Sequence, residues 1–524
     1  MLTTTANFEQ TAKSNMRHVS WQFSAAFDRQ FNAATKFFQL DVSQLDGPDL
    51  LAPDDNDTIV EWDKYAYTDY SNRVVSLEWS REEEPHSSLV MAMADIVLDN
   101  HDHLFTADDF ILPYRPVRIQ AGFNGENIPA FVGVTDGLPK PDEKAGTVSL
   151  HCIDFLYSIS NRPLNQSVIY QDMRTDEIIE DLLVSQVGLT AGQYNLDTGI
   201  NRINFVYFEK GQKLGDALKK LMEAEQGRLF MSELGIITFK NRAHYDDAPV
   251  WYFDRSSIID ASQPSEDDIV NVVEITSKVR TVQEKGSIFT LTEAILINPG
   301  QTVDVWANFN DPVVSCDDPV PLSGSTTSYY QAFTNQDGSG TEVTSNLLLG
   351  ITDLFATSFK MTFTNNGGLA AWLTKIELFG EPATNVAPLF VREVDQASID
   401  KYDERVLSID NEFFTDENSM SSMAQIILDD YSEYGDIFDS NVKGNMALQV
   451  GDTIGAGIRE RTTVSGGVLT NHGISAFDYK ITKIENKLID GGFAQRLKLK
   501  RFTRRNFFQL DVSRLDDANV VLAP

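Results

Sequence analysis

Apolar and polar residues alternate along much of the chain, a pattern typical of β-strands with one buried face. Between Ile59 and Phe155 the alternation recurs in short segments, as where Val75, Leu77 and Trp79 alternate with Ser76 and Glu78. Gly, Pro and Asn residues separate these segments. Short strands at this spacing favour an antiparallel barrel or sandwich.

The pattern becomes helical after residue 165. Thr175 is placed to cap a helix that buries Ile178 and Leu182 and ends at Gly188. A second helix is expected over residues 214–227, followed by a hairpin that turns near Gly235. We therefore predict a small α+β unit over residues 166–245.

Strands return after Asn241, and residues 289–387 are rich in Thr, Ser, Asn and aromatic side chains. This composition suggests an inserted β-sandwich. Within it, residues 358–364 and 370–379 flank Asn365-Asn-Gly-Gly368, which predicts a hairpin because Asn-Gly favours the primed turns. On either side, residues 246–288 and 388–505 are read as mainly strand, with a short helix at Ser419–Tyr431 and a last turn at Asp490–Gly492.

The two ends of the chain carry a near-identical decapeptide. Residues 37–46 read FFQLDVSQLD and residues 507–516 read FFQLDVSRLD. Two distant copies are too few for a solenoid, which stacks three or more units. They are interpreted either as a repeated attachment element or as two similar edge strands. The apolar positions of these expected docking arms are Phe37, Phe38, Leu40, Val42, Leu45, Phe507, Phe508, Leu510, Val512 and Leu515.

Charge excludes one class of protein. The 524 residues include 77 acidic and 43 basic side chains, a net charge of −34. Because binding to nucleic acid depends largely on Lys and Arg, we expect the chain not to bind DNA or RNA tightly. The acidity could line a path along which DNA slides, or it could serve solubility. No stretch approaches the roughly 18 apolar residues of a membrane span, and the start lacks the pattern of a secretory signal.

A basic segment near the C-terminus departs from this acidity. Alternation places Arg496, Lys498 and Lys500 on one strand face, opposite Leu497 and Leu499. The face is either solvated or a contact for an acidic surface, such as another copy of the chain. The complete set is Arg496, Lys498, Lys500, Arg501, Arg504 and Arg505.

The sequence offers little catalytic chemistry. His101 and His103, with Asp99 and Asp102, allow a metal site or a surface loop. Residues 335–340 partly match a calcium loop but lack its bidentate Glu, so a turn is the other interpretation. Nucleophile-elbow, HExxH and phosphate-loop motifs are missing, and two distant cysteines exclude a disulfide framework. We therefore expect no catalytic residues, no metal site, no cofactor and no enzyme activity.

The order of several segments resembles the tail-hub, or tail-tip, proteins of bacteriophages, which are related to the hub of contractile-tail baseplates. The similarity covers most of the chain, and each motif alone is unspecific. An insertion common in such proteins is similar to residues 359–380. The other segments are the two decapeptides, YAYTDY at 65–70, VVSLEWS at 74–80, ADIVLDN at 94–100, LPYRPVRIQAGF at 112–123, RTDE at 174–177 and AEQGRLFMSELG at 224–235.

The resemblance implies a mainly β, multidomain fold with two tube-like antiparallel β-barrels, a small α+β domain and an inserted β-sandwich. Three chains would form a ring that joins a six-fold tail tube to a three-fold tip. The implied divisions are an N-terminal extension (1–58), a first barrel (59–165), the α+β domain (166–245), a discontinuous second barrel (246–288 and 388–505), the inserted sandwich (289–387) and a C-terminal arm (506–524).

By the same resemblance, the expected partners are further copies in a homotrimer, the tail tube or distal tail protein, and tail-fibre or tip proteins. DNA would pass without being bound. The location would be the virion tail, assembled in the bacterial cytoplasm. No C-terminal peptidase or wall hydrolase is recognisable, in contrast to some relatives.

One rival function is a peripheral receptor- or glycan-binding tail protein that uses the inserted sandwich. Its candidate stacking residues are Trp306, Tyr329, Tyr330 and Trp372, which could equally be core. A wall hydrolase is a further alternative.

Overall fold

The protein is mainly β. The computed structural model describes residues 1–14, 17–27, 65–83, 89–106, 111–242, 249–253, 257–261, 269–322, 327–414, 416–432, 437–456, 461–465, 468–472, 477–489, 492–501, 506–507 and 520–521. Strands make up 49% and helices 18% of the structure, which confirms the mainly β class. The strand pairings do not show two closed barrels.

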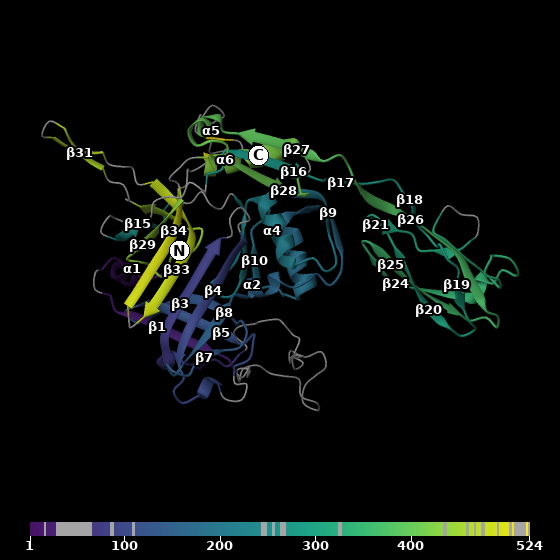
Figure 1. The fold of residues 1–524 in the computed structure, drawn as a ribbon, viewed down its shortest axis with the longest axis horizontal. Helices are drawn as coiled ribbons and strands as arrows, with labels where there is room; N and C mark the ends of the chain where they lie inside the picture. Colours follow the sequence, from purple (N-terminus) through teal and green to yellow (C-terminus); the bar gives the residue numbers. More distant parts are fainter. Residues whose placement is uncertain are drawn as a thin grey trace.

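Strands from both predicted barrels join instead in one sheet of 17 strands (Figure 1). The N-terminal part supplies β1 (Val19–Ala25), β2 (Thr68–Asp69), β3 (Val74–Glu83), β4 (Leu89–Asp99), β5 (Pro116–Phe123), β6 (Glu126–Thr135), β7 (Lys140–Asp142) and β8 (Thr147–Ile153). The later part supplies β14 (Trp251–Phe253), β15 (Ile258–Ala261), β29 (Ile437–Val442), β30 (Thr453–Ala456), β33 (Phe477–Ile489) and β34 (Gly492–Arg501). The remaining three are β10 (Tyr194–Leu196), β12 (Arg228–Met231) and β13 (Ile237–Lys240).

The long strand β33 joins the N-terminal and the later strands into one sheet. Its first residues pair with β30, and the rest pairs with β3, from Lys483 opposite Glu82 to Ile489 opposite Ser76. Phe23, Leu77 and Leu497 are fully buried in a common core. Alternation in a sequence defines the buried face of a strand but not its partner, so the pairing of β33 with β3 could not be read from the sequence.

A second core joins the α+β unit to a three-stranded sheet. The α+β unit contains α2 (Phe155–Ser160), β9 (Val168–Arg174), α3 (Thr175–Asp181), a π-helical turn (Leu182–Val187), β11 (Arg202–Phe208) and α4 (Leu214–Glu225). The sheet β27 (Leu389–Val394), β16 (Val272–Ser277) and β28 (Val406–Asp410) is accompanied by α5 (Gln396–Tyr402) and α6 (Glu417–Tyr431). Phe208 and Phe413 meet edge-to-face across this junction, with ring centroids 5.8 Å apart. The residues predicted as part of a second barrel thus divide between two cores.

The start of α3 differs from the prediction. Arg174 occupies the N-cap, and its backbone N–H donates to Glu177 Oε2. Thr175 lies inside the helix, where its hydroxyl donates to the buried Glu225. The helical segment ends at Gly188, as expected, with a positive φ of 83° that favours glycine.

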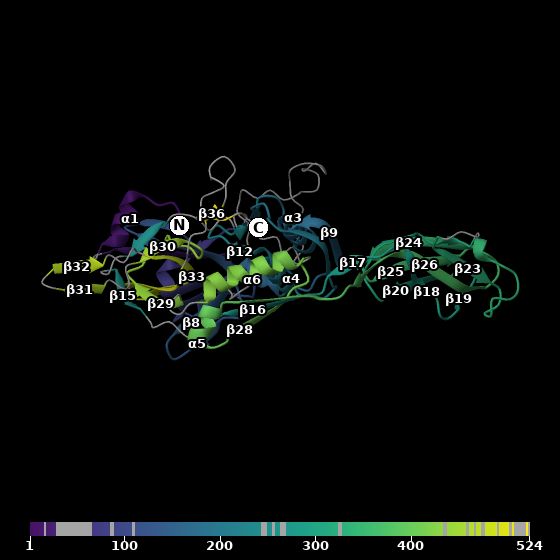
Figure 2. The same cartoon turned by 90° about the horizontal axis from the view of Figure 1, so that it is seen from above.

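Residues 280–385 form a two-sheet insertion that extends away from the body (Figures 1 and 2). One sheet places β17 (Arg280–Val282), β18 (Gly286–Thr290), β19 (Ile295–Ile297), β21 (Val313–Cys316), β22 (Val320–Pro321) and β23 (Tyr329–Phe333) around the long strand β26 (Ala371–Asn385). The other consists of β20 (Thr302–Asn308), β25 (Ser358–Asn365) and β24 (Leu347–Phe355). A separate core fills the space between them.

The predicted hairpin of residues 358–379 is wrong. β25 pairs with β20 and β24, whereas β26 belongs to the opposite sheet. Asn365 makes the change of sheet: its Nδ2 donates to the carbonyls of Ile297 and Leu369, and its Oδ1 accepts the N–H of Gly367. The Asn-Gly segment is therefore a crossing between layers rather than a tight turn.

The smaller elements lie at the margins. They are α1 (Ala6–Lys13), the 3₁₀ turns Ser71–Arg73, Leu104–Thr106 and Thr344–Asn346, the hairpin β31 (Arg461–Ser465) and β32 (Val468–His472), and the parallel pair β35 (Asn506–Phe507) and β36 (Val520–Val521). Across the described part of the chain, every helix is too short or too polar to cross a bilayer.

Candidate interaction surfaces

The repeated decapeptides lie largely outside the described residues. The whole first copy does so, and with it Phe37, Phe38, Leu40, Val42 and Leu45. Of the second copy only Phe507 is described; it pairs in parallel with Val521. The remaining docking-arm positions, Phe508, Leu510, Val512 and Leu515, are again outside. Their expected role stays a prediction.

The basic face lies on β34. Leu497 and Leu499 point into the common core, whereas Arg496 on the opposite face is exposed. Arg496 Nη2 lies 2.7 Å from Asp439 Oδ2, and Lys500 Nζ lies 3.4 Å from the ring centroid of Tyr431. These two cations are therefore engaged by their own chain. Lys498 shares the face, Arg501 ends the strand, and Arg504 and Arg505 lie outside the described residues.

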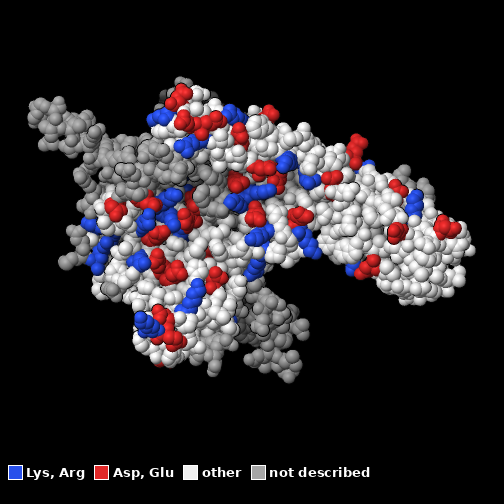
Figure 3. All heavy atoms as spheres, in the orientation of Figure 1, with Lys and Arg blue, Asp and Glu red and all other residues white. Residues whose placement is uncertain are grey.

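Charges of both signs are intermixed over the body on the face shown in Figure 3, whereas the insertion presents few of them there. Neither basic nor acidic side chains dominate the body surface on this face, even though the chain as a whole is strongly acidic.

Each of the two histidines considered as possible metal ligands lies near a carboxylate. His101 Nδ1 lies 2.6 Å from Asp99 Oδ1, and His103 Nδ1 lies 3.9 Å from Glu143 Oε2. A search of the described residues finds no group of three or more potential ligands. In the calcium-like loop, Asp337 Oδ1 accepts bonds from Ser339 N and Oγ, which lower the pKa of Asp337. That carboxylate stabilises its own turn.

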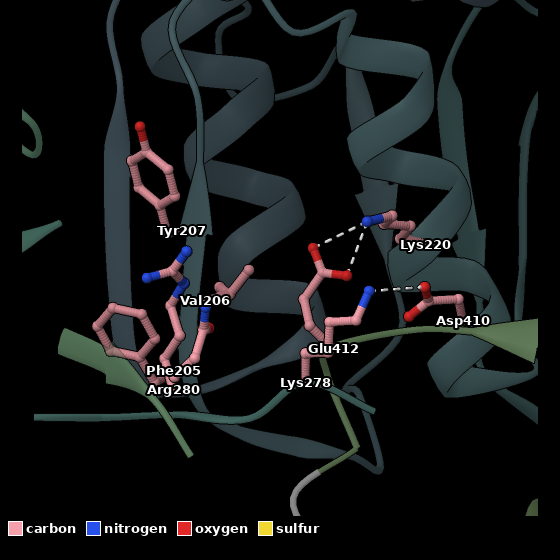
Figure 4. A pocket seen from close by; sticks show the side chains of 9 residues that line it. Phe205, Val206, Tyr207, Lys220, Lys278, Arg280, Asp410 and Glu412 are labelled. Atoms are coloured by element: carbon pink, nitrogen blue, oxygen red, sulfur yellow. Dashed lines mark hydrogen bonds and ion pairs between the residues drawn. The ribbon is translucent and has the colours of Figure 1, made fainter. Parts of the chain in front are cut away.

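A pocket of about 500 Å³ lies at the base of the insertion (Figure 4). Lys220 Nζ on α4 lies 2.8 and 2.7 Å from the two carboxylate oxygens of Glu412. Lys278 Nζ lies 3.4 Å from Asp410 Oδ2, at the end of β28. The other lining residues are Phe205, Val206, Tyr207, Arg280 and Asn385. The first pair joins α4 to Glu412, just after β28, and the second joins the end of β28 to the segment that leads from β16 into the insertion. Because Arg280 and Asn385, at the two ends of the insertion, also line the pocket, it marks the point of attachment.

The insertion has a second attachment. The backbone N–H of Ala356 donates to Ser167 Oγ at 3.2 Å. The Tyr207 hydroxyl also forms a hydrogen bond with Thr357. Burial raises the pKa of Tyr207, and this effect is larger than the lowering by the bond. Two contacts at separate points fix the direction in which the insertion leaves the body.

A buried ion pair connects β3 to the turn of the β12–β13 hairpin within the large sheet. Arg81 Nη1 lies 2.8 Å from Glu233 Oε1 and donates to the carbonyl of Met231 at 2.9 Å. Gln449 Nε2 donates to the other oxygen of Glu233. Sequence reasoning missed this pair, although a signal existed: Arg81 has the same parity as the inward-facing Leu77 and Trp79.

Asp154 is fully buried at the start of α2. Its carboxylate accepts the backbone N–H groups of Tyr157, at 2.6 Å, and of Ala92, at 2.7 Å. It therefore caps a helix and fastens it to β4 in the same contact. Burial raises the pKa of Asp154 from 3.8 to about 6.

We expect Asp154→Asn to alter the pH dependence of stability. Because the folded-state pKa lies above the unfolded value, ionising Asp154 costs free energy only in the folded protein. The contribution of Asp154 to the free energy of unfolding therefore falls by up to about 3 kcal/mol as the pH rises from about 4 to about 6. Asparagine cannot ionise. In urea unfolding, the free energy of unfolding of the variant should therefore rise relative to that of the wild type across this pH interval. A difference that is constant with pH would contradict the expectation.

The four aromatic residues of the glycan-binding alternative do not form one site. Tyr330 is buried in the insertion core. Trp306 lies on the sheet of β20, β25 and β24, whereas Tyr329 on β23 and Trp372 on β26 belong to the opposite sheet. The structure thus separates Trp306 from the other three.

Comparisons with known proteins give similarity of fold alone. No family model matches the chain, and no curated protein does. Three solved structures are similar at 10% identity: the 43 kDa tail protein of prophage MuSo2 from Shewanella oneidensis (83% of this chain, 95% of that one, TM-score 0.43), a tail protein from Neisseria meningitidis MC58 (84%, 94%, 0.45) and the prophage tail protein gp18 from Listeria monocytogenes EGD-e (84%, 93%, 0.40).

The expected resemblance to phage tail proteins is confirmed as structural similarity. At these identities and TM-scores, the similarity by itself defines neither the site nor the function of this chain.

Proposed function

We propose that the chain is a structural protein of a phage-type tail, acting as its hub or tip. The observation that carries the proposal is the single open sheet, in which strands far apart in sequence, such as β3 and β33, share one core. Among the described strands, β2 pairs only with β1 and β15 only with β29. Since open sheet edges expose unpaired backbone groups, an assembly that covers them stabilises the protein.

The finer role follows from the sequence resemblance. Three copies would form a ring that caps or extends the tail tube, converts six-fold to three-fold symmetry and anchors distal tail or fibre proteins. An acidic wall would let DNA pass during ejection without retaining it. We propose no enzyme activity and no cofactor, and zymography on cell-wall material should therefore show no clearing.

Removing residues 507–524 tests the docking role of the second decapeptide. The deletion takes away β36 and all of β35 except Asn506, so the short parallel pair is removed as a unit. If the segment docks on another subunit, we expect loss of the assembled species, with a melting temperature of the monomer within about 2 °C of the wild type.

Arg514→Gln is the matched control for this deletion. It makes the second decapeptide identical to the first, and it should therefore preserve assembly. A deletion variant whose monomer collapses would show that this segment belongs to the core and does not dock.

The alternative, peripheral glycan binding, has one specific observation in its favour. Trp306 stands on an open sheet face of the insertion with 49% of its surface exposed. The four-aromatic site expected from the sequence is not formed, so any such function must rest on this face alone.

A further inference from the structure

The outer face of the β20–β25–β24 sheet has a composition unlike that of the core. Burial alternates cleanly along β25, where Phe359, Met361 and Phe363 point into the insertion core. The intervening side chains point outward, Lys360 and Thr362 among them. Figures 1 and 2 show the insertion standing clear of the body, which leaves room for a ligand of extended shape.

Two aromatic side chains approach each other across this face. Trp306 on β20 and Phe355 at the end of β24 lie on opposite sides of β25, in register with Lys360 and Ser358. Their ring planes are nearly parallel, 14° apart, with centroids separated by 6.1 Å. Such rings offer an apolar surface for stacking at little entropic cost, because few rotatable bonds have to be fixed.

A row of polar groups runs beside the rings. Asp304 Oδ2 lies 3.0 Å from Lys360 Nζ, and Asp304 Oδ1 accepts the Thr362 hydroxyl at 2.8 Å. The bonds from Lys360 and Thr362 lower the pKa of Asp304, so its carboxylate stays ionised. The charges of Asp304 and Lys360 offset each other, and together with the threonine they present fixed donors and acceptors.

We propose that this face binds a neutral oligosaccharide. A pyranose ring has one apolar face that stacks on an indole, while its hydroxyls both donate and accept hydrogen bonds. Trp306 supplies the stacking surface, and Asp304 and Lys360 supply the partners for hydroxyls. An anionic glycan is disfavoured, because the chain carries a net charge of −34. This inference is independent of the tail role proposed above.

Binding by the full-length protein to neutral hexose oligosaccharides of four to six sugars tests the proposal, with hexuronic-acid oligomers as the anionic comparison. The readout is calorimetry or quenching of tryptophan fluorescence. We expect affinity for one or more neutral oligomers, a loss of at least tenfold with Trp306→Leu, a smaller loss with Asp304→Asn, and partial retention with Trp306→Phe. The last variant keeps a ring but removes the larger indole.

Trp372→Leu is the matched control, because it removes an indole from the opposite sheet of the same insertion. It should leave the affinity unchanged, and all variants should keep the wild-type melting temperature. The proposal is overturned by a wild-type protein that binds no neutral oligomer, by equal losses in the two tryptophan variants, or by a preference for uronic acids. A change of native mass in Trp306→Leu without any glycan binding would instead assign the face to a protein contact.

Discussion

Replacing Arg81 with Met is expected to lower the free energy of unfolding by about 3–5 kcal/mol. The substitution leaves Glu233 charged and without its cation in a position where both side chains are more than nine-tenths buried. It also removes the donor that reaches the carbonyl of Met231. Since the pair joins β3, which packs in the first core, to the β12–β13 hairpin, which packs in the second, its loss weakens the contact between the two cores.

The double variant Arg81→Met/Glu233→Met separates the pair from the packing. Replacing both partners removes the unpaired charge, so urea unfolding should show a smaller loss than in the single variant. A single variant as stable as the wild type would contradict the account. Equal losses in the single and the double variant would do so too.

Replacing Glu225 with Ala should destabilise the α+β unit by about 3 kcal/mol or more. The buried carboxylate accepts three bonds, from the backbone N–H groups of Ile200 (2.8 Å) and Asn201 (2.9 Å) and from Thr175 Oγ1 (3.0 Å). Burial raises the pKa of Glu225, which shows that desolvation opposes its charge. Two backbone N–H groups are left without an acceptor, and the Thr175 hydroxyl keeps only the carbonyl of Asn201 at 3.4 Å, which together outweigh the relief of that penalty.

Glu225→Gln is the matched control, because it keeps one acceptor oxygen at the same position. It should lose roughly 1–2 kcal/mol in urea unfolding, less than the alanine variant. If the two variants were equally stable, the three hydrogen bonds would not be what holds the loop before β11 to the end of α4.

Local patterns in the sequence predicted the elements well but not their partners. The helices after residue 165, the turn at Gly235 and the β33–β34 hairpin all occur as expected. These features depend on neighbours close in sequence, where spacing and turn residues carry the information. The docking-arm residues lie mostly outside the described part of the chain, so that prediction stays open.

Pairing between distant segments was beyond local patterns. β33 pairs with β30 and with β3. Nothing in its alternation shows that β3, about 400 residues earlier, is one of its neighbours. Likewise, the Asn-Gly pair after Asn365 reads as a hairpin turn until the amide of Asn365 is seen to bond residues of two layers. The exposed face around Trp306 could not be distinguished from core for the same reason: one strand shows which residues share a side, but not what covers that side.

The central claim, that this chain builds a ring in a tail, is tested most directly by its native mass. Light scattering on the purified full-length protein, with negative-stain images of the same peak, gives the stoichiometry and the shape together. The account predicts about 176 kDa, three times 58.6 kDa, with three-lobed rings. A single species of 58.6 kDa at the highest soluble concentration, with images of isolated particles, would contradict it.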